Sequence, residues 1–150
     1  MSIILMNQVF NLSTSTMKDV KYLKLPSYPA ENGELVVMEG VSDVPFSIAR
    51  VFVVRASKGD VRGEHAHKLC SQLLICSSGK IDVSIDDGHE ISKFSLDRPD
   101  IGLFLPPGIW AVENYLEDNS VLVVLCDRPY ELNDYIREYD LFKEYRSQVQ

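Results

Sequence analysis

The segment 80–86 constrains the fold most, because its side chains alternate strictly. Its two isoleucines and one valine fall on one face, and its charged and hydroxyl residues fall on the other. This period of two predicts a half-buried strand. Asp87-Gly88 follows at once and is typical of a tight hairpin turn, so we expect the chain to return antiparallel through residues 91–96.

Short runs of the same kind recur between Val20 and Leu125. They cover residues 34–38, 49–54, 70–76, 102–105 and 120–125. Strands separated by turn residues at intervals of about 8 to 12 are typical of an all-β sandwich or barrel. The run 121–125 is apolar throughout, and we expect it to be buried on both faces.

The two ends of the chain differ from this pattern. Residues 1–17 have little period and many small hydroxyl side chains, which favours a loosely held arm or an edge strand. In residues 131–150 charged residues separate Ile136, Leu141 and Phe142, which predicts one or two helical turns packed on the barrel. Residues 18–130 contain no repeat or linker, so the 150 residues are expected to form one domain.

Charge and cysteine usage narrow the class of protein. The net charge of -7 comes without any cluster of Lys and Arg, which argues against a general nucleic-acid or membrane surface. The apolar stretch 3–6 is too short for a signal or a membrane span, and we expect a cytoplasmic protein. Cys70, Cys76 and Cys126 form no C-x-x-C pair and are expected to be buried thiols.

Two of the three histidines, His65 and His67, stand one residue apart. Residues i and i+2 of a strand point to the same face, so both imidazoles should converge on one spot. In a barrel interior they would give a pocket two groups that titrate near neutrality. The alternative is a pair of surface histidines on a solvated strand.

The spacing around this pair resembles the first motif of the cupin superfamily, whose fold is a jelly-roll barrel (a double-stranded β-helix). Five residues separate Gly59 from His65-x-His67. Gln72 follows where an acid is usual, and six residues separate it from Gly79. The resemblance implies a cupin jelly roll with a short C-terminal helical segment.

A second cupin motif is recognisable in segment 102–111, where Ala111 stands in the place of a histidine. Metal-dependent cupins hold their ion with three histidines and one glutamate, and this chain keeps two of the four. Zinc or iron sites normally need three protein ligands, so we expect no metal and no cofactor.

Eight ordered blocks resemble the sugar 3,4-ketoisomerases acting on dTDP-4-keto-6-deoxyglucose, which are metal-free cupins. The blocks are 45–52, 62–68, 72–76, 86–88, 96–99, 102–103, 109–110 and 134–142. The resemblance implies an isomerase that moves a keto group between C4 and C3 of a dTDP-linked 6-deoxyhexose, for bacterial surface glycans such as O-antigen or S-layer. It also implies cytoplasmic homodimers whose subunits exchange N-terminal strands.

Roles follow from the reaction, which removes the C3 proton, passes through an enediol and protonates C4. His65 is expected to carry the proton, and His67 to polarise or orient the sugar oxygen. Arg62 is expected near the pocket mouth, where a guanidinium suits a diphosphate. Its alternative role is a salt bridge with Glu64 or another acid.

Three positions depart from the family pattern: Ala111, Phe52 and Asn32 stand where relatives carry His, Tyr and Arg. Other groups are expected to complete the substrate-binding set. They are Gln72, Trp110, Glu113 and Tyr115, of which the last two follow Ala111 on one strand face and Trp110 can stack on thymine or belong to the core.

Two other functions remain open. One is a catalytically silent cupin that binds a nucleotide sugar or a glycan-assembly partner. The other is a metal-independent jelly-roll epimerase, which needs a His–Asp dyad and a Tyr acid. No acid next to the histidines in the sequence is placed for such a dyad.

Overall fold

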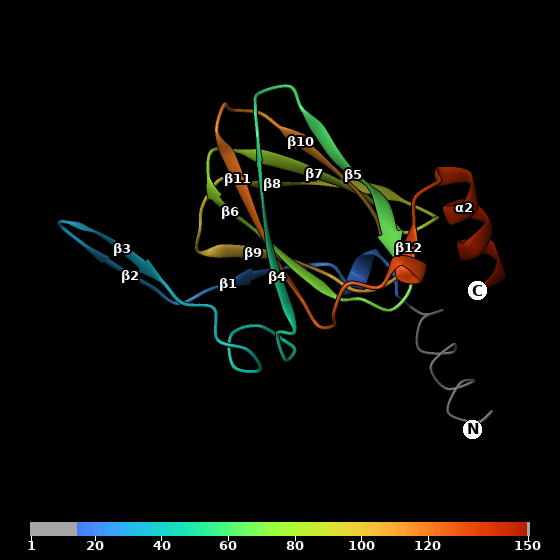
Figure 1. Ribbon diagram of the computed structural model, residues 1–150, viewed down its shortest axis with the longest axis horizontal. Helices are drawn as coiled ribbons and strands as arrows, with labels where there is room; N and C mark the ends of the chain where they lie inside the picture. The colour runs from blue at the N-terminus through green and yellow to red at the C-terminus, as the bar shows by residue number, and fades with distance from the viewer. Residues whose placement is uncertain (1–14, 150) are drawn as a thin grey trace.

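The computed structural model describes residues 15–149, which form two facing antiparallel sheets with a helix at the C-terminal end (Figure 1). The elements are η1 (Met17–Asp19), β1 (Lys21–Lys24), β2 (Ser27–Ala30), β3 (Gly33–Val36), β4 (Arg50–Ala56), β5 (Val61–His67), β6 (Gln72–Ser78), β7 (Ile81–Asp86), β8 (Ile91–Leu96), β9 (Ile101–Leu105), β10 (Trp110–Tyr115), β11 (Ser120–Cys126), η2 (Leu132–Asp134), β12 (Tyr135–Ile136) and α2 (Tyr139–Gln148).

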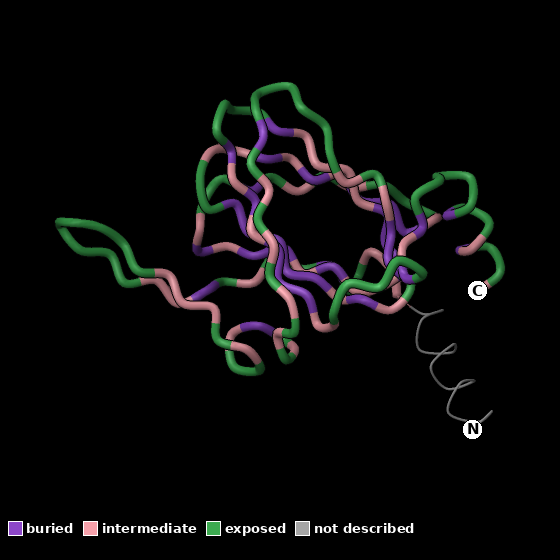
Figure 2. The backbone as a smooth tube through the Cα atoms, in the orientation of Figure 1, coloured by how far each residue is buried: buried purple, intermediate pink, exposed green. Residues whose placement is uncertain are grey.

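Each large sheet has five strands. One has the order β1-β9-β6-β11-β4 and the other β12-β5-β10-β7-β8. Their inward side chains form the main core, which includes Cys76, Ile81, Val83, Leu103 and Leu122. Figure 2 shows the buried stretches along the facing strands and the exposed hairpin of β2 and β3 that projects from them. The predicted all-β fold with a C-terminal helical segment is confirmed.

The alternating segment 80–86 forms β7, and the predicted hairpin with β8 is confirmed. Ile81 pairs with Leu96 and Asp86 with Ile91, so the register closes on the Asp87-Gly88 turn. Gly88 has a φ of +93°, a conformation that glycine adopts without steric cost.

The apolar run predicted to be buried on both faces forms most of β11, at the centre of its sheet between β6 and β4. Leu122 and Val124 point into the main core. Leu125 packs on the outer face, against Val44 from the loop before β4. Two apolar layers therefore cover this strand, which explains why no polar residue interrupts it.

The C-terminal region is helical only in part. Ile136 lies in β12, where it pairs with Ala66 of β5, rather than in the predicted helical turn. Helix α2 begins three residues later, at Tyr139. This start sets the helical phase so that Phe142 is buried and Leu141 is 56% exposed. The predicted packing of Leu141 on the barrel is therefore wrong, and that of Ile136 and Phe142 is confirmed.

Most of the predicted N-terminal arm, residues 1–14, lies outside the described residues. The chain after it is held near α2, since Arg146 Nη2 donates a hydrogen bond to the Ser15 carbonyl at 2.6 Å. β1 then pairs with β9 of its own chain. None of the helices in residues 15–149 is long and apolar enough to cross a membrane.

Candidate active site

A β-bulge in β5 shapes the site. Ala111 of β10 pairs with His65, but the next pair is Val112 with Gly63, so Glu64 is an extra residue with a φ of +57°. Gly63 also has a positive φ, and a Cβ there would lie 3.0 Å from the Ala111 carbonyl oxygen. The bulge shifts by one residue the alternation of side chains between the two faces of β5.

The shift has a consequence for the side chains of β5. Arg62 and His65 are three residues apart. In a regular strand an odd separation places two side chains on opposite faces. Here both line the same cavity. Glu64 is exposed, as expected for the residue beside His65.

Two cavities meet inside the barrel and share His65, Gln72 and Glu113 in their walls. The inner one has a volume of about 10 Å³ and is also lined by His67, Cys70, Leu74, Leu105, Pro106, Ile109 and Ala111. The outer one has a volume of about 230 Å³ and is also lined by Arg50, Phe52, Val54, Arg62, Gly63, Val124, Tyr135 and Arg137. Only the outer cavity has room for a sugar ring, and the three shared side chains are the ones that face both spaces.

His65 is held as a neutral imidazole. Its Nδ1 lies 3.0 Å from the Gly63 carbonyl oxygen. A carbonyl only accepts, so Nδ1 carries the hydrogen and Nε2 keeps a free lone pair. Burial lowers the pKa of His65 to about 4, and the positive charge of Arg137 acts in the same direction, opposed by the hydrogen bond to the Gly63 carbonyl. At neutral pH His65 is therefore a proton acceptor.

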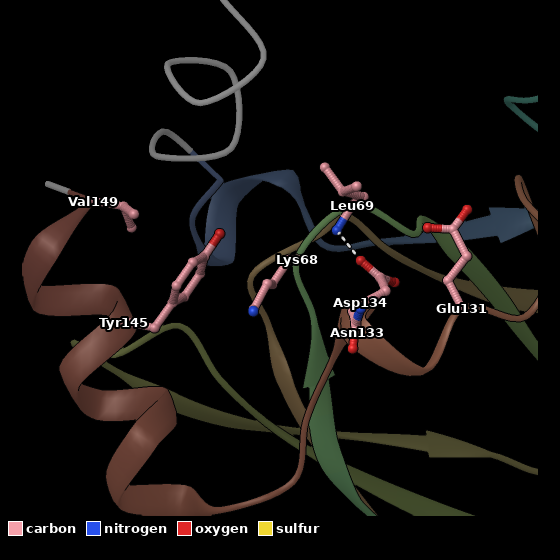
Figure 3. A pocket seen from close by; sticks show the side chains of 7 residues that line it. All are labelled: Lys68, Leu69, Glu131, Asn133, Asp134, Tyr145 and Val149. Atoms are coloured by element: carbon pink, nitrogen blue, oxygen red, sulfur yellow. Dashed lines mark hydrogen bonds between the residues drawn. The ribbon is translucent and has the colours of Figure 1, made fainter. Parts of the chain in front are cut away.

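His67 forms a buried pair with Asp134, the residue before β12, at 2.9 Å between Nδ1 and Oδ2. The Asp134 carboxylate also accepts a hydrogen bond from the backbone N–H of Leu69 at 2.6 Å, as Figure 3 shows, and one from the backbone N–H of Cys70 at 3.3 Å. Burial opposes its charge, but the hydrogen bonds from His67 and Leu69 hold the pKa of Asp134 below its usual value. The expectation that no acid forms a His–Asp dyad is wrong, because β12 brings an acid 67 residues away to β5.

The pair leaves one atom of His67 unused. Its Nε2 is buried and has no hydrogen-bond partner among the described residues. The His67 ring also stands edge-on to the His65 ring, with 5.0 Å between the centroids. The two histidines are thus brought together as predicted, in the barrel interior rather than on a solvated face.

Tyr135 covers both histidines and was missed by the sequence reasoning. Its ring centroid lies 5.1 Å from that of His65 and 4.3 Å from that of His67. Its hydroxyl accepts a hydrogen bond from Arg50 Nη2 at 3.2 Å, and the Arg137 guanidinium lies 4.3 Å from its ring centroid. The signal was present in the Asp134-Tyr135-Ile136-Arg137 block, which was assigned to a helical turn.

Three arginines line the outer cavity: Arg50, Arg62 and Arg137. Within residues 15–149 none of them forms an ion pair with a carboxylate. The alternative role of Arg62, a salt bridge with Glu64 or another acid, is therefore wrong for the described chain. Arg50 and Arg137 were missed because they are isolated in the sequence and converge only through β4 and the segment after β12.

Glu113 lies where the sequence predicted, in the wall of both cavities. Burial raises its pKa above the ordinary value, opposed by the Tyr115 hydroxyl and Arg62. Tyr115 lies behind it in the core, 1% exposed, and its hydroxyl donates to Glu113 Oε2 at 3.2 Å. Gln72 also lines both cavities, and its Nε2 donates to Cys126 Sγ at 3.5 Å.

Trp110 lies outside both cavities. Its ring packs against Tyr139 and Phe142 of α2, with centroid distances of 5.3 and 5.6 Å. The structure therefore corrects the expectation that Trp110 binds substrate. The neighbours Trp110 and Ala111 point to opposite faces of β10, and the indole is on the face that α2 covers.

One group in the described residues has ligand atoms close enough to hold a metal ion: His67, Cys70 and Asp134, whose atoms lie within 4.8 Å of one another. The hydrogen bonds of Asp134 to His67, Leu69 and Cys70 already occupy its carboxylate. These contacts account for the buried acid without a cation. All three cysteines are buried and unpaired, as predicted.

Comparison with known proteins finds close relatives. The family model described as FdtA, WxcM-like, C-terminal, matches residues 18–147. A TDP-4-oxo-6-deoxy-alpha-D-glucose-3,4-oxoisomerase of Aneurinibacillus thermoaerophilus is 40% identical over 118 residues, which are 78% of this chain and 85% of the relative.

Solved structures agree with this match. A mutant of the 3,4-ketoisomerase QdtA of Thermoanaerobacterium thermosaccharolyticum, in complex with TDP-4-keto-6-deoxyglucose, gives a TM-score of 0.85 at 30% identity, over 89% of this chain and 97% of its own. The TDP-quinovose 3,4-ketoisomerase WlaRB of Campylobacter jejuni gives 0.80 at 36% identity, over 85% and 99%.

Proposed function

Because the chain belongs to the FdtA, WxcM-like family of dTDP-sugar 3,4-ketoisomerases, we propose that it moves the keto group of a dTDP-4-keto-6-deoxyhexose from C4 to C3. The observation that carries the proposal is the position of His65. It is a neutral base in the wall of a cavity that also has three arginines, none of which forms an ion pair within residues 15–149.

The outer cavity is the proposed binding site for the sugar and the diphosphate. Arg50, Arg62 and Arg137 are the cations available there to a doubly charged diphosphate, and guanidinium groups bind phosphate oxygens bidentately. This local positive charge offsets the overall charge of -7. The sugar ring then lies against His65 and Glu113.

His65 is the proposed carrier of the carbon-bound proton. Its Nε2 takes the proton from C3, the C–H electron pair forms the C3=C4 bond of an enediolate, and the C4 carbonyl pair moves onto oxygen. The imidazolium then returns the proton to C4 while the C3 oxygen becomes the carbonyl. The sequence needs no external oxidant or reductant, since the carbon-bound proton and its electron pairs stay within the sugar and the imidazole while the hydroxyl proton passes from O3 to O4.

A single base has a stereochemical consequence. In a gluco-configured substrate the C3 hydrogen is axial, and an imidazole that does not change sides returns the proton to C4 from that same face. The C4 hydroxyl of the product is then axial, which is the galacto configuration.

The proposed role of the His67–Asp134 pair is to hold the neighbouring side chains of the site in position. Their pair fixes the His67 ring, which stands against His65 and against the Tyr135 ring. The unpartnered Nε2 of His67 is available to accept a hydrogen bond from a sugar hydroxyl that reaches the inner cavity.

The test is incubation with dTDP-4-keto-6-deoxyglucose in deuterated water, followed by NMR. Transfer of the keto group to C3 is the expected result, with deuterium at C4 in the fraction of turnovers in which the imidazolium exchanges its proton with solvent before returning it. Binding of the nucleotide sugar without any exchange would instead indicate the silent cupin and overturn the enzyme proposal.

An epimerase is the second candidate, and the His67–Asp134 pair beside Tyr135 is the observation that favours it, since this chemistry needs a His–Asp dyad and a Tyr acid. The same experiment separates the two. Deuterium at C3 or C5 without movement of the keto group would indicate epimerisation.

The proposed assembly is a homodimer with exchange of N-terminal strands. The hairpin of β2 and β3 projects from the barrel and exposes Tyr28 and Leu35 (Figure 1). The outer face of β4, at the end of its sheet, exposes Val51 and Val53. We expect twice the mass of one 17.0 kDa chain in sedimentation, and a monomer for Val53→Lys. A monomeric parent protein would contradict the proposal.

The proposed setting is the bacterial cytoplasm, where the product would supply amino sugars for surface glycans such as O-antigen or S-layer. The substrate and product are both nucleotide sugars, so an aminotransferase acting on the new C3 keto group is the class of enzyme that would consume the product.

A further inference from the structure

We infer that Glu113 is a catalytic residue of this isomerase, which carries the hydroxyl proton of the substrate from the C3 oxygen to the C4 oxygen. The inference rests on the proposed function and deepens it. His65 accounts for the proton on carbon, and Glu113 accounts for the proton on oxygen.

The reaction requires a second proton carrier. In the substrate C4 carries a carbonyl and C3 a hydroxyl, and in the product these are exchanged. One proton therefore moves from C3 to C4 and another from O3 to O4. An imidazole that holds the carbon-derived proton through the enediolate cannot carry the second proton at the same time, so another side chain must accept from O3 and donate to O4.

The position of Glu113 fits this role. It follows Ala111 by two residues on β10, so both point to the same face, and Ala111 pairs directly with His65. Glu113 thereby reaches the same two cavities as His65. The small side chain of Ala111 contributes only a methyl group to the inner cavity, which leaves Glu113 as the acid of β10 that faces the sugar.

Three other polar groups in the walls of the two cavities are less suited to the task. The Gln72 amide does not titrate, and its Nε2 is engaged by Cys126 Sγ. The Tyr135 hydroxyl accepts from Arg50. The lone pair of His65 is already used for carbon. Glu113 has one carboxylate oxygen bound by Tyr115, which leaves the other for substrate.

The environment of Glu113 tunes it for proton exchange. Burial raises its pKa above the ordinary value of a glutamate, and the groups that oppose this are the Tyr115 hydroxyl from β10 and the Arg62 guanidinium from β5. His65 on β5 is neutral, and the facing residues of β7, Val83 and Ile81, carry no charge. A general acid or base is most effective when its pKa lies near the working pH.

The chemical step balances without any further reactant. The Glu113 carboxylate accepts the O3 proton as the C3=O bond forms, and the resulting carboxylic acid donates that proton to O4. The carboxylate is regenerated at the end of the turnover. The C3–H bond breaks and the C4–H bond forms at His65, as before.

Glu113→Gln tests the assignment, because it keeps the shape and removes the titrating group. We expect kcat for keto migration to fall by about 100-fold, the lower end of the effect of a general acid or base, with KM nearly unchanged. Exchange of solvent deuterium into C3 of the substrate should continue, since His65 is intact, so the ratio of exchange to isomerisation rises. Glu117→Gln, an exposed glutamate in the loop after β10, is the matched control and should keep full activity.

A pH profile gives an independent readout. The parent enzyme should lose kcat on the acid side as Glu113 is protonated, and Glu113→Gln should lack this limb. Tyr115→Phe removes a donor to the carboxylate, which raises the pKa of Glu113 further and should move the limb to higher pH.

The outcomes separate the inference from the proposed function. If the parent protein moves no keto group, the proposed function fails. If the parent isomerises and Glu113→Gln isomerises equally well, or loses C3 exchange in step with isomerisation, the role of Glu113 is overturned and the ketoisomerase stands.

Discussion

The outer and inner cavities share three side chains but are built for different tasks. The outer cavity, about 230 Å³, has three arginines that pair with no acid in residues 15–149. The inner one, about 10 Å³, is closed by the buried His67–Asp134 pair and apolar core residues. The unpaired charges thus lie in the outer cavity, while the inner one is too small for a sugar ring and is lined by His67, the partner of Asp134. His65 joins the two.

Removing His65, the base in the wall of both cavities, should have the largest effect on kcat. His65→Asn keeps a polar side chain but cannot hold a proton, and we expect kcat to fall by about 1000-fold or more. Thermal unfolding should change little. His89→Asn, the exposed third histidine in the turn between β7 and β8, is the matched control. A fully active His65→Asn protein would remove His65 from the mechanism.

Removing the acid that pairs with His67 should have the next largest effect on kcat. Asp134→Asn removes the acceptor of His67 and weakens two backbone contacts, so we expect kcat to fall more than about 10-fold and the free energy of unfolding to fall by about 1–3 kcal/mol at pH 7. Urea denaturation measures the second effect. Asp82→Asn loses the surface pair with Lys93 and keeps an oxygen that can accept from the Ser95 hydroxyl, so it should cost less than about 1 kcal/mol.

The pH dependence of this loss follows from the lowered pKa of Asp134. Its contribution to stability is complete above the pKa of the unfolded chain, about 3.9, and is lost as the pH falls through the lower value of the folded state. Parent and Asp134→Asn proteins should therefore differ at pH 7 and converge below about pH 4. A difference that persists at low pH would contradict the account.

A substitution in the outer cavity should affect substrate binding. Arg62→Met removes one charge from the outer cavity, and we expect KM to rise about 10-fold, the cost of one charge-assisted hydrogen bond, with kcat within about twofold. The loss should shrink at high salt. Arg55→Met, an exposed arginine of β4, is the control and should leave KM unchanged. A fall in kcat alone would place Arg62 in the chemical step instead.

A change outside both cavities should have the smallest effect on catalysis. Trp110→Phe weakens the packing of α2, so we expect a loss of about 1–2 kcal/mol in stability and no change in kcat or KM. Thermal unfolding and steady-state kinetics measure the two effects. A raised KM would return Trp110 to the substrate site.

The features of the site that the sequence predicted are local ones. The period of two in β7 and the pairing of His65 with His67 on one strand depend on neighbours along the chain. The sequence did not reveal the bulge at Glu64, because it depends on the register of β5 against β10. A positive φ at a glutamate has no signature in a single sequence.

Contacts between segments that lie far apart along the chain could not be predicted from the sequence either. Asp134 and Tyr135 reach the histidines only because two residues of β12 pair with β5, and so short a strand has no periodic pattern to detect. Trp110 was assigned to the site because its ring can stack on a thymine, with a place in the core as the alternative. The packing of the whole barrel decides which face of β10 points to the interior and which face contacts α2.

The configuration of C4 in the product tests the central claim most directly, that His65 alone carries the carbon-bound proton. The NMR spectrum of the 3-keto product formed from dTDP-4-keto-6-deoxyglucose in ordinary water gives it through the coupling between the C4 and C5 hydrogens. A small coupling, from an axial C4 hydroxyl, is the predicted result. A large coupling, from an equatorial hydroxyl, would mean that a second group protonates the opposite face and would contradict the single-base account.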